Sequence, residues 1–337
     1  MGSGKWTSLF WGGRGVGPSG FGSSSTADQV TEGIDAGNLT AIVTGATSGI
    51  GIETARVLAL RGANVIIPCR RLDSGLKLQE RILEENPNAR IEVMEMDLSS
   101  LDSVESFARC FCSSHEHLNI LINNAGIFAC PFQLSVDGVE LQFATNYLGH
   151  FLLTDLLLDK MKTTAKKTGR QGRIVNVSTF GHTRNFDESW FDLNKINDRS
   201  KYDRFGAYSH SKLGNIWHAS ELSRCLQEEG CNVTANSLHP GVIATNLTRF
   251  MNLKQFTLES IAFVFKLFIK TIPQGAATSC YVALHPAVRD VTGKYFVDCD
   301  EALPSLAARD KELSRKFWNF TKELLVKLRK ANAHFGE

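Results

Sequence analysis

No stretch of the sequence reaches the roughly 20 consecutive apolar residues that a membrane-spanning helix needs. The first residues also lack the apolar core of a secretory signal. These two absences predict a chain that is neither secreted nor transmembrane. The formal net charge is only +2 at pH 7, so the chain has no general field for nucleic acid and no nucleic-acid partner is expected.

Paired cysteine motifs are absent as well. The eight cysteines are scattered, with no Cys-x-x-Cys and no histidine at zinc spacing. We therefore expect free thiols in a reducing compartment and no metal site. Apolar residues make up 43% of the 337 residues and charged residues 21%, which is enough to bury a full core. This balance predicts one large domain with appendages.

Residues 1–36 are rich in Gly and Ser and contain no acidic residue before Asp28. Such a composition buries little apolar surface, which predicts a flexible segment. Two interpretations remain open. The segment is either an unstructured tail or a plastid-type targeting leader, because such leaders are Ser-rich and poor in acids.

From residue 39 onward, apolar strands alternate with helical patterns. Strands are expected at 39–43, 64–69, 90–96, 118–122, 172–178, 232–238 and 294–298. Helices are expected at 52–60, 73–86, 100–114, 137–162 and 206–229. The alternation predicts a single α/β domain over 37–303, a Rossmann-type doubly wound parallel sheet with helices on both faces. Such sheets bind ligands at the carboxyl ends of their strands.

A glycine-rich turn joins the first strand to the first helix. Its glycines would let the backbone approach a pyrophosphate at the positive end of the helix. An NAD enzyme carries an acid after the second strand, but this chain has Arg70 and Arg71, and a guanidinium suits a 2′-phosphate. NADP(H) is therefore the expected cofactor, with two solvated surface arginines as the alternative.

Further candidate cofactor residues follow the third and fourth strands. Asp97 could meet the adenine edge, although a lone Asp after a strand is more often a helix cap. Together with the turn, the cofactor residues expected in this half of the chain are Gly45, Thr47, Ser48, Gly49, Ile50, Gly51, Arg70, Asp97, Leu98, Asn124, Ala125 and Gly126.

Tyr208 and Lys212 stand at positions i and i+4 of a predicted helix and so share one face. Hydride transfer at a carbinol carbon requires a proton transfer at its oxygen, and a phenol with a pKa of about 10 is a poor base at neutral pH. A nearby ammonium favours the phenolate and lowers that pKa. We therefore predict Tyr208 as the catalytic acid/base, assisted by Lys212.

These motifs jointly resemble the classical short-chain dehydrogenase/reductase family. The matching elements, in the family's order, are Thr44-Gly45-x3-Gly49-x-Gly51, Asn123-Asn124-Ala125-Gly126, Asn146, Val177-Ser178-Thr179, Tyr208-x3-Lys212 and Pro240-Gly241. The resemblance implies about seven strands in the order 3-2-1-4-5-6-7. It also implies that Asn146 supports a water relay to Lys212, and that Lys212 also holds the nicotinamide ribose. Four further residues are implied to seat the cofactor: Thr145, Pro240, Gly241 and Thr245.

One position departs from the family pattern. The second hydroxyl of a Val-Ser-Ser sequence polarises the substrate in the family, and that register falls here on Thr179, after Ser178. Threonine keeps the hydroxyl but adds a methyl group and stiffens χ1. We assign the polarising role to Thr179, with Ser178 as the alternative; a third interpretation is a weakened enzyme.

Longer motifs resemble the retinol-dehydrogenase-like branch of the family. They are Cys69-Arg70-Arg71, the segment 141–150, Ser211-Lys212-Leu213-Gly214-Asn215 and Leu238-His239-Pro240-Gly241. The branch implies an NADP(H)-dependent enzyme that interconverts a lipophilic alcohol and an aldehyde or ketone. Within it, the chain is similar to plant members associated with the protein-import translocon of the plastid inner envelope. That similarity implies a peripheral plastid-envelope location, translocon association, calmodulin responsiveness and redox sensing.

Several alternatives stay open at this point. A cytoplasmic or other membrane-associated location is the alternative to the plastid, and a homodimer is a further expectation. An NADP(H)-sensing subunit of the import complex, with dispensable catalysis, is the alternative function.

Two appendages complete the prediction. A lid is expected near 246–272, where the apolar segment 257–272 could lie on a membrane with Lys266 and Lys270 at the interface, or form a buried helix. The C-terminal part, 304–337, is expected to be a basic amphipathic helix. Its segment 311–330 is typical of calmodulin targets and membrane-surface helices, or else packs on the flank of the sheet. Trp190, Phe191 and Tyr202 are expected to line the substrate pocket.

Overall fold

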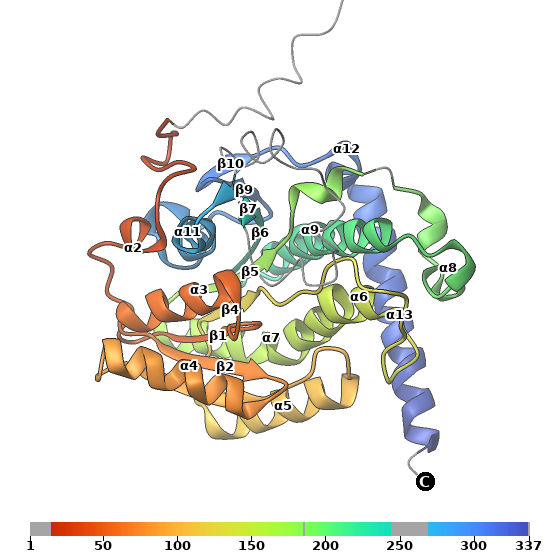
Figure 1. The fold of residues 1–337 in the computed structure, drawn as a ribbon, viewed down its shortest axis with the longest axis horizontal. Coiled ribbons are helices and arrows are strands. Elements are labelled where there is room, and N and C mark those ends of the chain that lie inside the picture. Colours follow the sequence, from red (N-terminus) through yellow and green to blue (C-terminus); the bar gives the residue numbers. More distant parts are fainter. Residues whose placement is uncertain (1–14, 185, 244–268, 336–337) are drawn as a thin grey trace, which may run out of the picture.

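The computed structural model describes residues 15–184, 186–243 and 269–335 (Figure 1). Eight strands form the main sheet, in the order β10-β9-β6-β5-β4-β1-β2-β3. They are β1 (Thr40–Val43), β2 (Asn64–Cys69), β3 (Arg90–Glu95), β4 (Ile120–Asn123), β5 (Gly172–Val177), β6 (Val233–His239), β9 (Tyr295–Val297) and β10 (Asp300–Ala302). Only β9 and β10 pair antiparallel. The predicted order of seven strands is confirmed, and β10 adds an edge strand that was not predicted.

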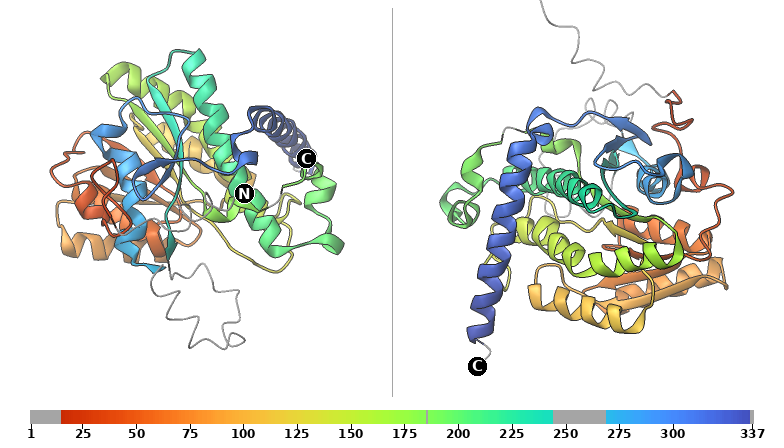
Figure 2. Two further views of the ribbon diagram at one scale, coloured as in Figure 1. Left: turned by 90° about the horizontal axis from the view of Figure 1, so that it is seen from above. Right: turned by 180° about the vertical axis from the view of Figure 1, so that it is seen from behind.

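Helices cover both faces of the sheet (Figures 1 and 2). The core on one face receives side chains from α3 (Gly49–Leu60), α4 (Leu72–Glu85) and α11 (Ile272–Leu284). The core on the other face receives them from α5 (Leu101–Ser114), α7 (Gly149–Thr168) and α9 (Arg204–Glu228). This is the doubly wound α/β architecture that the alternating pattern predicted. No helix in the described part of the chain is long and apolar enough to cross a bilayer.

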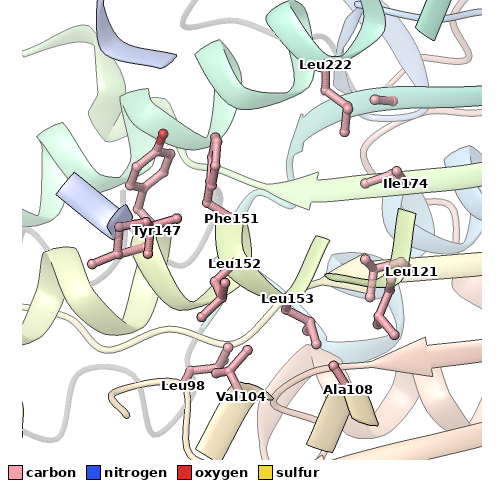
Figure 3. Close-up of a cluster of buried hydrophobic side chains, with 14 of the residues drawn as sticks. Leu98, Val104, Ala108, Leu121, Tyr147, Phe151, Leu152, Leu153, Ile174 and Leu222 are labelled. Carbon is pink, nitrogen blue, oxygen red and sulfur yellow. The ribbon is translucent and has the colours of Figure 1, made fainter. Parts of the chain in front are cut away.

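Figure 3 shows part of the core between the sheet and α5 and α7. Val104 of α5, Leu153 of α7 and Leu121 of β4 are completely shielded from solvent there. Burying each such side chain contributes roughly 1.5–3 kcal/mol. The sheet is thereby held rigid beneath the loops that carry polar residues at its carboxyl edge.

The helix expected over 137–162 is interrupted. The chain forms α6 (Leu141–Phe143), then a π-helix (Ala144–Leu148), and continues as α7. Glu140 caps α6 by accepting hydrogen bonds from the N–H groups of Gln142 and Phe143, so the helix starts four residues later than predicted. A π turn changes the side-chain register and is frequent at functional sites. Here it contains Thr145 and Asn146.

Residues 15–36 pack against the domain, contrary to the predicted flexible segment. Ala27 and Val30 of α2 (Ala27–Val30) are buried, and Phe21 stacks edge-on against Tyr281 of α11. Asp28 forms an ion pair with Arg56 of α3 at 2.6 Å. The composition of the segment did not predict these contacts, because a few apolar residues are enough to order a segment that packs on the surface of a folded domain. Residues 1–14 lie outside the described residues.

The C-terminal segment also belongs to the core. After α12 (Leu306–Arg309), α13 (Lys311–Phe335) packs against α9 and crosses it at a steep angle (Figures 1 and 2). Its apolar side chains Phe317, Leu324, Leu325 and Leu328 are buried. Of the alternatives for 311–330, the structure shows the packed helix with a solvated basic face.

Candidate active site

The glycine turn between β1 and α3 leaves no room for side chains. Gly45 has a φ of +67°, and a Cβ there would lie 2.7 Å from Ala125 Cα. A Cβ on Gly51 would lie 2.3 Å from Gly45 O. Ser48, the N-cap of α3, makes no side-chain capping bond, so the first N–H groups of the helix remain available to an anion. The predicted residues Gly45, Thr47, Ser48, Gly49, Ile50 and Gly51 thus form one cradle that fits a pyrophosphate.

Thr44 joins this cradle to the segment after β4 through hydrogen bonds. Its hydroxyl oxygen accepts hydrogen bonds of 2.9 Å from the N–H groups of Asn124 and Ala125. The Asn124 side chain donates to Thr44 O at 2.7 Å. The predicted residues of this segment therefore lie directly against the glycine turn.

His150 is a residue of the site that sequence reasoning missed. Its Nε2 lies 2.8 Å from the Thr44 hydroxyl and its Nδ1 lies 3.1 Å from Asn146 O. Burial lowers the pKa of His150 to about 3, so the ring is neutral. Because the carbonyl can only accept, Nδ1 carries the proton and Nε2 accepts from Thr44. In the sequence, Asn146 and His150 stand four residues apart on one predicted helix, and this spacing alone does not mark His150 as a residue of the site.

At the adenosine end of the predicted site, the arginines are available to a ligand, whereas Asp97 and Leu98 have other contacts. Arg70 and Arg71 are exposed, and neither forms an ion pair with another described residue. They therefore leave two guanidinium groups that suit a phosphate. Asp97 Oδ1 instead accepts from both the N–H and the hydroxyl of Ser99. Leu98 is a core side chain, only 7% exposed.

Tyr208 and Lys212 lie on the inner face of α9, 8% and 3% exposed. Lys212 Nζ donates to Val177 O at 2.9 Å and lies 6.0 Å from the centre of the Tyr208 ring. Burial raises the pKa of the Tyr208 phenol above its ordinary value and lowers the pKa of Lys212 to about 8. The expected lowering of the Tyr208 pKa by Lys212 is wrong for this structure, because desolvation dominates at both groups.

Thr179, rather than Ser178, meets Tyr208. The Thr179 side chain lies beside the Tyr208 hydroxyl, where it lowers the pKa of the phenol against the larger effect of burial. The Ser178 hydroxyl donates to Lys212 O at 2.7 Å and is only 2% exposed. Ser178 therefore holds the strand end against α9, and the hydroxyl available beside Tyr208 is that of Thr179.

Asn146, in the π-helix, lies near Lys212. Its carboxamide accepts from Ile127 N–H at 2.8 Å and donates to Ser211 Oγ at 3.0 Å. A Cβ placed on Gly126 would lie 3.4 Å from both Asn146 Oδ1 and Lys212 Nζ. The bare backbone of Gly126 therefore faces both polar groups. Thr145, in the same π-helix, is partly exposed.

The segment after β6 carries the last predicted cofactor residues. Pro240 is buried, and Gly241 has a φ of +97° with Lys270 side-chain atoms against it. Thr245 and most of the expected lid lie outside the described residues. The segment's ends are paired as β7 (Val242–Ile243) and β8 (Ile269–Lys270). Lys270, expected at a membrane interface, instead forms an ion pair with Asp298.

The three aromatic residues expected to line the substrate pocket have other contacts in the structure. Trp190 packs on His210, and Phe191 packs on Phe317 of α13, away from Tyr208. The Tyr202 hydroxyl is bound to Cys130 O and Glu140.

Phe128 stands edge-on to the Tyr208 ring, with centroids 4.6 Å apart, and also contacts Phe205. Sequence reasoning missed both phenylalanines. Their positions, two residues after Gly126 and three before Tyr208, were the signal.

Residues 39–188 match the family model described as short chain dehydrogenase. The sheet order, the glycine cradle and the Tyr208 cluster agree with that match, as do the relatives described next. The chain belongs to the short-chain dehydrogenase/reductase family, whose members are nicotinamide-dependent oxidoreductases.

Two kinds of relative are similar over most of the chain. "Short-chain dehydrogenase TIC 32 A, chloroplastic" of Brassica napus is 54% identical over 314 residues, 93% of this chain and 97% of that protein. "Retinol dehydrogenase 11" of Mus musculus is 39% identical over 285 residues, 85% of each chain. The resemblance to the retinol-dehydrogenase-like branch is thereby confirmed.

Solved structures share the fold. An uncharacterized Mycobacterium paratuberculosis protein, 30% identical, has a TM-score of 0.67 and covers 88% of this chain and 96% of its own. A Brucella melitensis 3-ketoacyl-(acyl-carrier-protein) reductase complexed with NADH has a TM-score of 0.59 at 22% identity, covering 77% and 96%. The second likeness shows the fold alone.

Proposed function

We propose that this protein is an NADP(H)-dependent oxidoreductase that interconverts a lipophilic alcohol and its aldehyde or ketone. One observation carries the proposal: the buried side chains of Tyr208 and Lys212 meet the partly buried Thr179 at the carboxyl edge of the sheet, beside the glycine cradle. When bound, the nicotinamide exchanges a hydride with the carbinol or carbonyl carbon.

Tyr208 supplies the proton at the substrate oxygen. Because burial raises its pKa, the phenol carries its proton at neutral pH. The protonated phenol is the form that can donate to a carbonyl oxygen in the reduction direction. The Thr179 hydroxyl, which lies beside that of Tyr208, polarises the same oxygen.

Lys212 and Asn146 support this step. We assign Lys212 to the nicotinamide ribose and, with Asn146, to a relay that returns a proton to Tyr208. The support is their shared approach to the bare backbone of Gly126. Thr145, Pro240, Gly241 and Thr245 remain proposed cofactor residues, as do Asp97 and Leu98 through their backbone turn.

Arg70 and Arg71 support the preference for NADP(H). Their guanidinium groups follow β2, where the ribose of a dinucleotide lies in this fold, and they have no ionic partner among the described residues. A 2′-phosphate would supply the missing negative charge.

An apolar substrate is supported by the surroundings of Tyr208. Phe128 stands edge-on to its ring, and Phe205, which contacts Phe128, is 39% exposed. Relatives named retinol dehydrogenases add to this support. The test is NADPH and NADH oxidation by the purified protein with apolar aldehydes of increasing length. Faster turnover with NADPH and longer chains is expected; turnover only with small polar carbonyls would contradict the substrate class.

A plastid location, peripheral at the inner envelope, is proposed from the similarity to TIC 32 A. That relative also favours a second function, an NADP(H)-sensing subunit of the import complex with dispensable catalysis. Calmodulin binding through 311–330 belongs to this hypothesis and requires α13 to leave the core, because Phe317 and Leu324 are buried. The homodimer stays a prediction.

The two functions differ in one measurement. Association of the protein with isolated envelope membranes is measured with and without NADPH, for the wild type and for Tyr208→Phe. A sensing subunit keeps its NADPH response in the variant and in the absence of any carbonyl substrate. An enzyme alone shows no NADPH-dependent association.

A further inference from the structure

Gly181 lies two residues after Thr179, in the short 3-10 helix Phe180–Thr183. Its backbone is outside the left-handed region that favours glycine, since its φ is not positive. Local conformation therefore does not require glycine here. Alanine at such a position usually stabilises a protein slightly, by restricting the unfolded chain.

The reason for glycine lies in the neighbouring side chain. A Cβ on residue 181 would lie 3.2 Å from Thr179 Cγ2, closer than the usual separation of about 3.5–4.0 Å between carbon atoms. The same Cβ would lie at ordinary distances from Thr179 Oγ1, 3.8 Å, and Ser209 Oγ, 3.9 Å. The methyl group is the atom that threonine has and serine lacks.

Thr179 has little freedom to move away. Its hydroxyl accepts from Gly181 N–H at 3.3 Å and lies beside the Tyr208 hydroxyl, so a χ1 rotation would break the first contact and remove the hydroxyl from the site. Its carbonyl accepts from His182 Nδ1 at 2.6 Å. His182 Nε2 in turn accepts from Ser305 N–H at 3.0 Å, which fixes both the ring and its protonation.

We propose that Gly181 is the positioning residue that allows a threonine to hold the substrate-polarising hydroxyl. With a larger residue at 181, only serine could place its hydroxyl beside Tyr208. The departure at Thr179 is thus matched by a compensating glycine, and does not mark a weakened site. This inference rests on the proposed role of Thr179.

A double-mutant cycle tests the proposal. The wild type, Gly181→Ala, Thr179→Ser and the double variant are compared for kcat in NADPH oxidation with an apolar aldehyde. Gly181→Ala should lower kcat about tenfold or more when residue 179 is threonine, with KM for NADPH little changed. In the Thr179→Ser background it should change kcat less than about threefold. An equal loss in both backgrounds, or none in either, overturns the proposal.

Thermal unfolding of the same four proteins provides a readout that needs no turnover. Gly181→Ala should lower Tm only when residue 179 is threonine, and should leave or raise it beside serine. If the wild type oxidises no NADPH, the proposed function is contradicted, and coupling in Tm alone then decides the steric role of Gly181. In that case, absence of coupling in Tm overturns it.

Discussion

At the scale of single residues, the site depends on two groups that burial pushes away from their charged forms. Tyr208 keeps its proton and Lys212 has its pKa lowered to about 8. No acidic group offsets the burial of Lys212, whose Nζ donates a hydrogen bond to the carbonyl oxygen of Val177. Burying a lysine without a carboxylate partner lowers the free energy of unfolding. Residues with such shifted pKa values are concentrated at functional sites.

The pH dependence of stability follows from this cost. The pKa of Lys212 falls from 10.5 to about 8, so below pH 8 both folded and unfolded states bind the proton and the full cost is present. Between about pH 8 and 10.5 only the unfolded state binds it, so stability rises with pH. Relative to Lys212→Met, the wild type should gain about 3 kcal/mol over that range. Denaturant unfolding at pH 7 and pH 10 measures this, and a constant difference contradicts it.

The cofactor preference is a second matter for single residues. Arg70→Ala should raise the Kd for NADPH about tenfold or more and leave the Kd for NADH unchanged, because only NADPH carries the 2′-phosphate. Arg81→Ala, an exposed arginine on α4, is the matched control. Fluorescence titration gives both constants. Equal weakening of NADPH and NADH would remove the assigned role.

The sequence was informative about residues with a fixed spacing and less so about their surroundings. Tyr208, Lys212 and Asn146 could be predicted because their chemistry requires particular side chains in order. Phe128 and His150 could not, since an aromatic or a buried histidine is common in any core and only the fold shows what it contacts. The pKa shifts of Tyr208 and Lys212 are set by burial, and the spacing of residues in a sequence does not show how deeply they are buried.

At the scale of elements, most strands and helices were predicted within a few residues, but the core helix α11 (Ile272–Leu284) was not predicted. The π-helix Ala144–Leu148 was not, because its pattern is that of an ordinary helix and tertiary contacts decide the extra residue. β10 was missed because its three residues, Asp300–Ala302, are two acids and an alanine and carry no strand pattern of their own. They pair because β9 presents an edge.

The segment 15–36 offers a test at this scale. Two truncated proteins, one lacking residues 1–14 and one lacking 1–36, are compared by denaturant unfolding. The longer deletion should cost about 3 kcal/mol or more beyond the shorter one, because Ala27, Val30 and Ala36 leave buried positions and Arg56 loses Asp28. Equal stability of the two would show that the contacts contribute nothing and that the whole segment is dispensable.

At the scale of the whole molecule, α13 completes the core on one side and presents its basic face to solvent. Phe317 contacts Trp217 and Tyr147, and Thr321 meets the Tyr147 hydroxyl at 2.8 Å. The C-terminal segment is therefore tied to the domain that carries the site. A partner that needs the apolar face of α13 must compete with these contacts.

Calmodulin is the partner to test here. A 305–337 peptide should bind calcium-loaded calmodulin at least about 100-fold more tightly than the intact chain, because each buried leucine or phenylalanine contributes roughly 1.5–3 kcal/mol to docking. Leu324→Asp is made in both the peptide and the intact chain. In the peptide it affects only the apolar face that would bind calmodulin, whereas in the intact chain it also weakens the docking of α13, so comparison of the two separates these effects. Equal affinities of peptide and intact protein would contradict a stably packed α13.

The central claim is that Tyr208 transfers the proton in a carbonyl reduction. The most direct measurement is single-turnover oxidation of bound NADPH by an apolar aldehyde, for the wild type, Tyr208→Phe and the control Tyr202→Phe. Tyr208→Phe should lower the rate at least about 100-fold with its Kd for NADPH nearly unchanged, while Tyr202→Phe retains most of the rate. A Tyr208→Phe protein that oxidises NADPH as fast as the wild type would contradict the account.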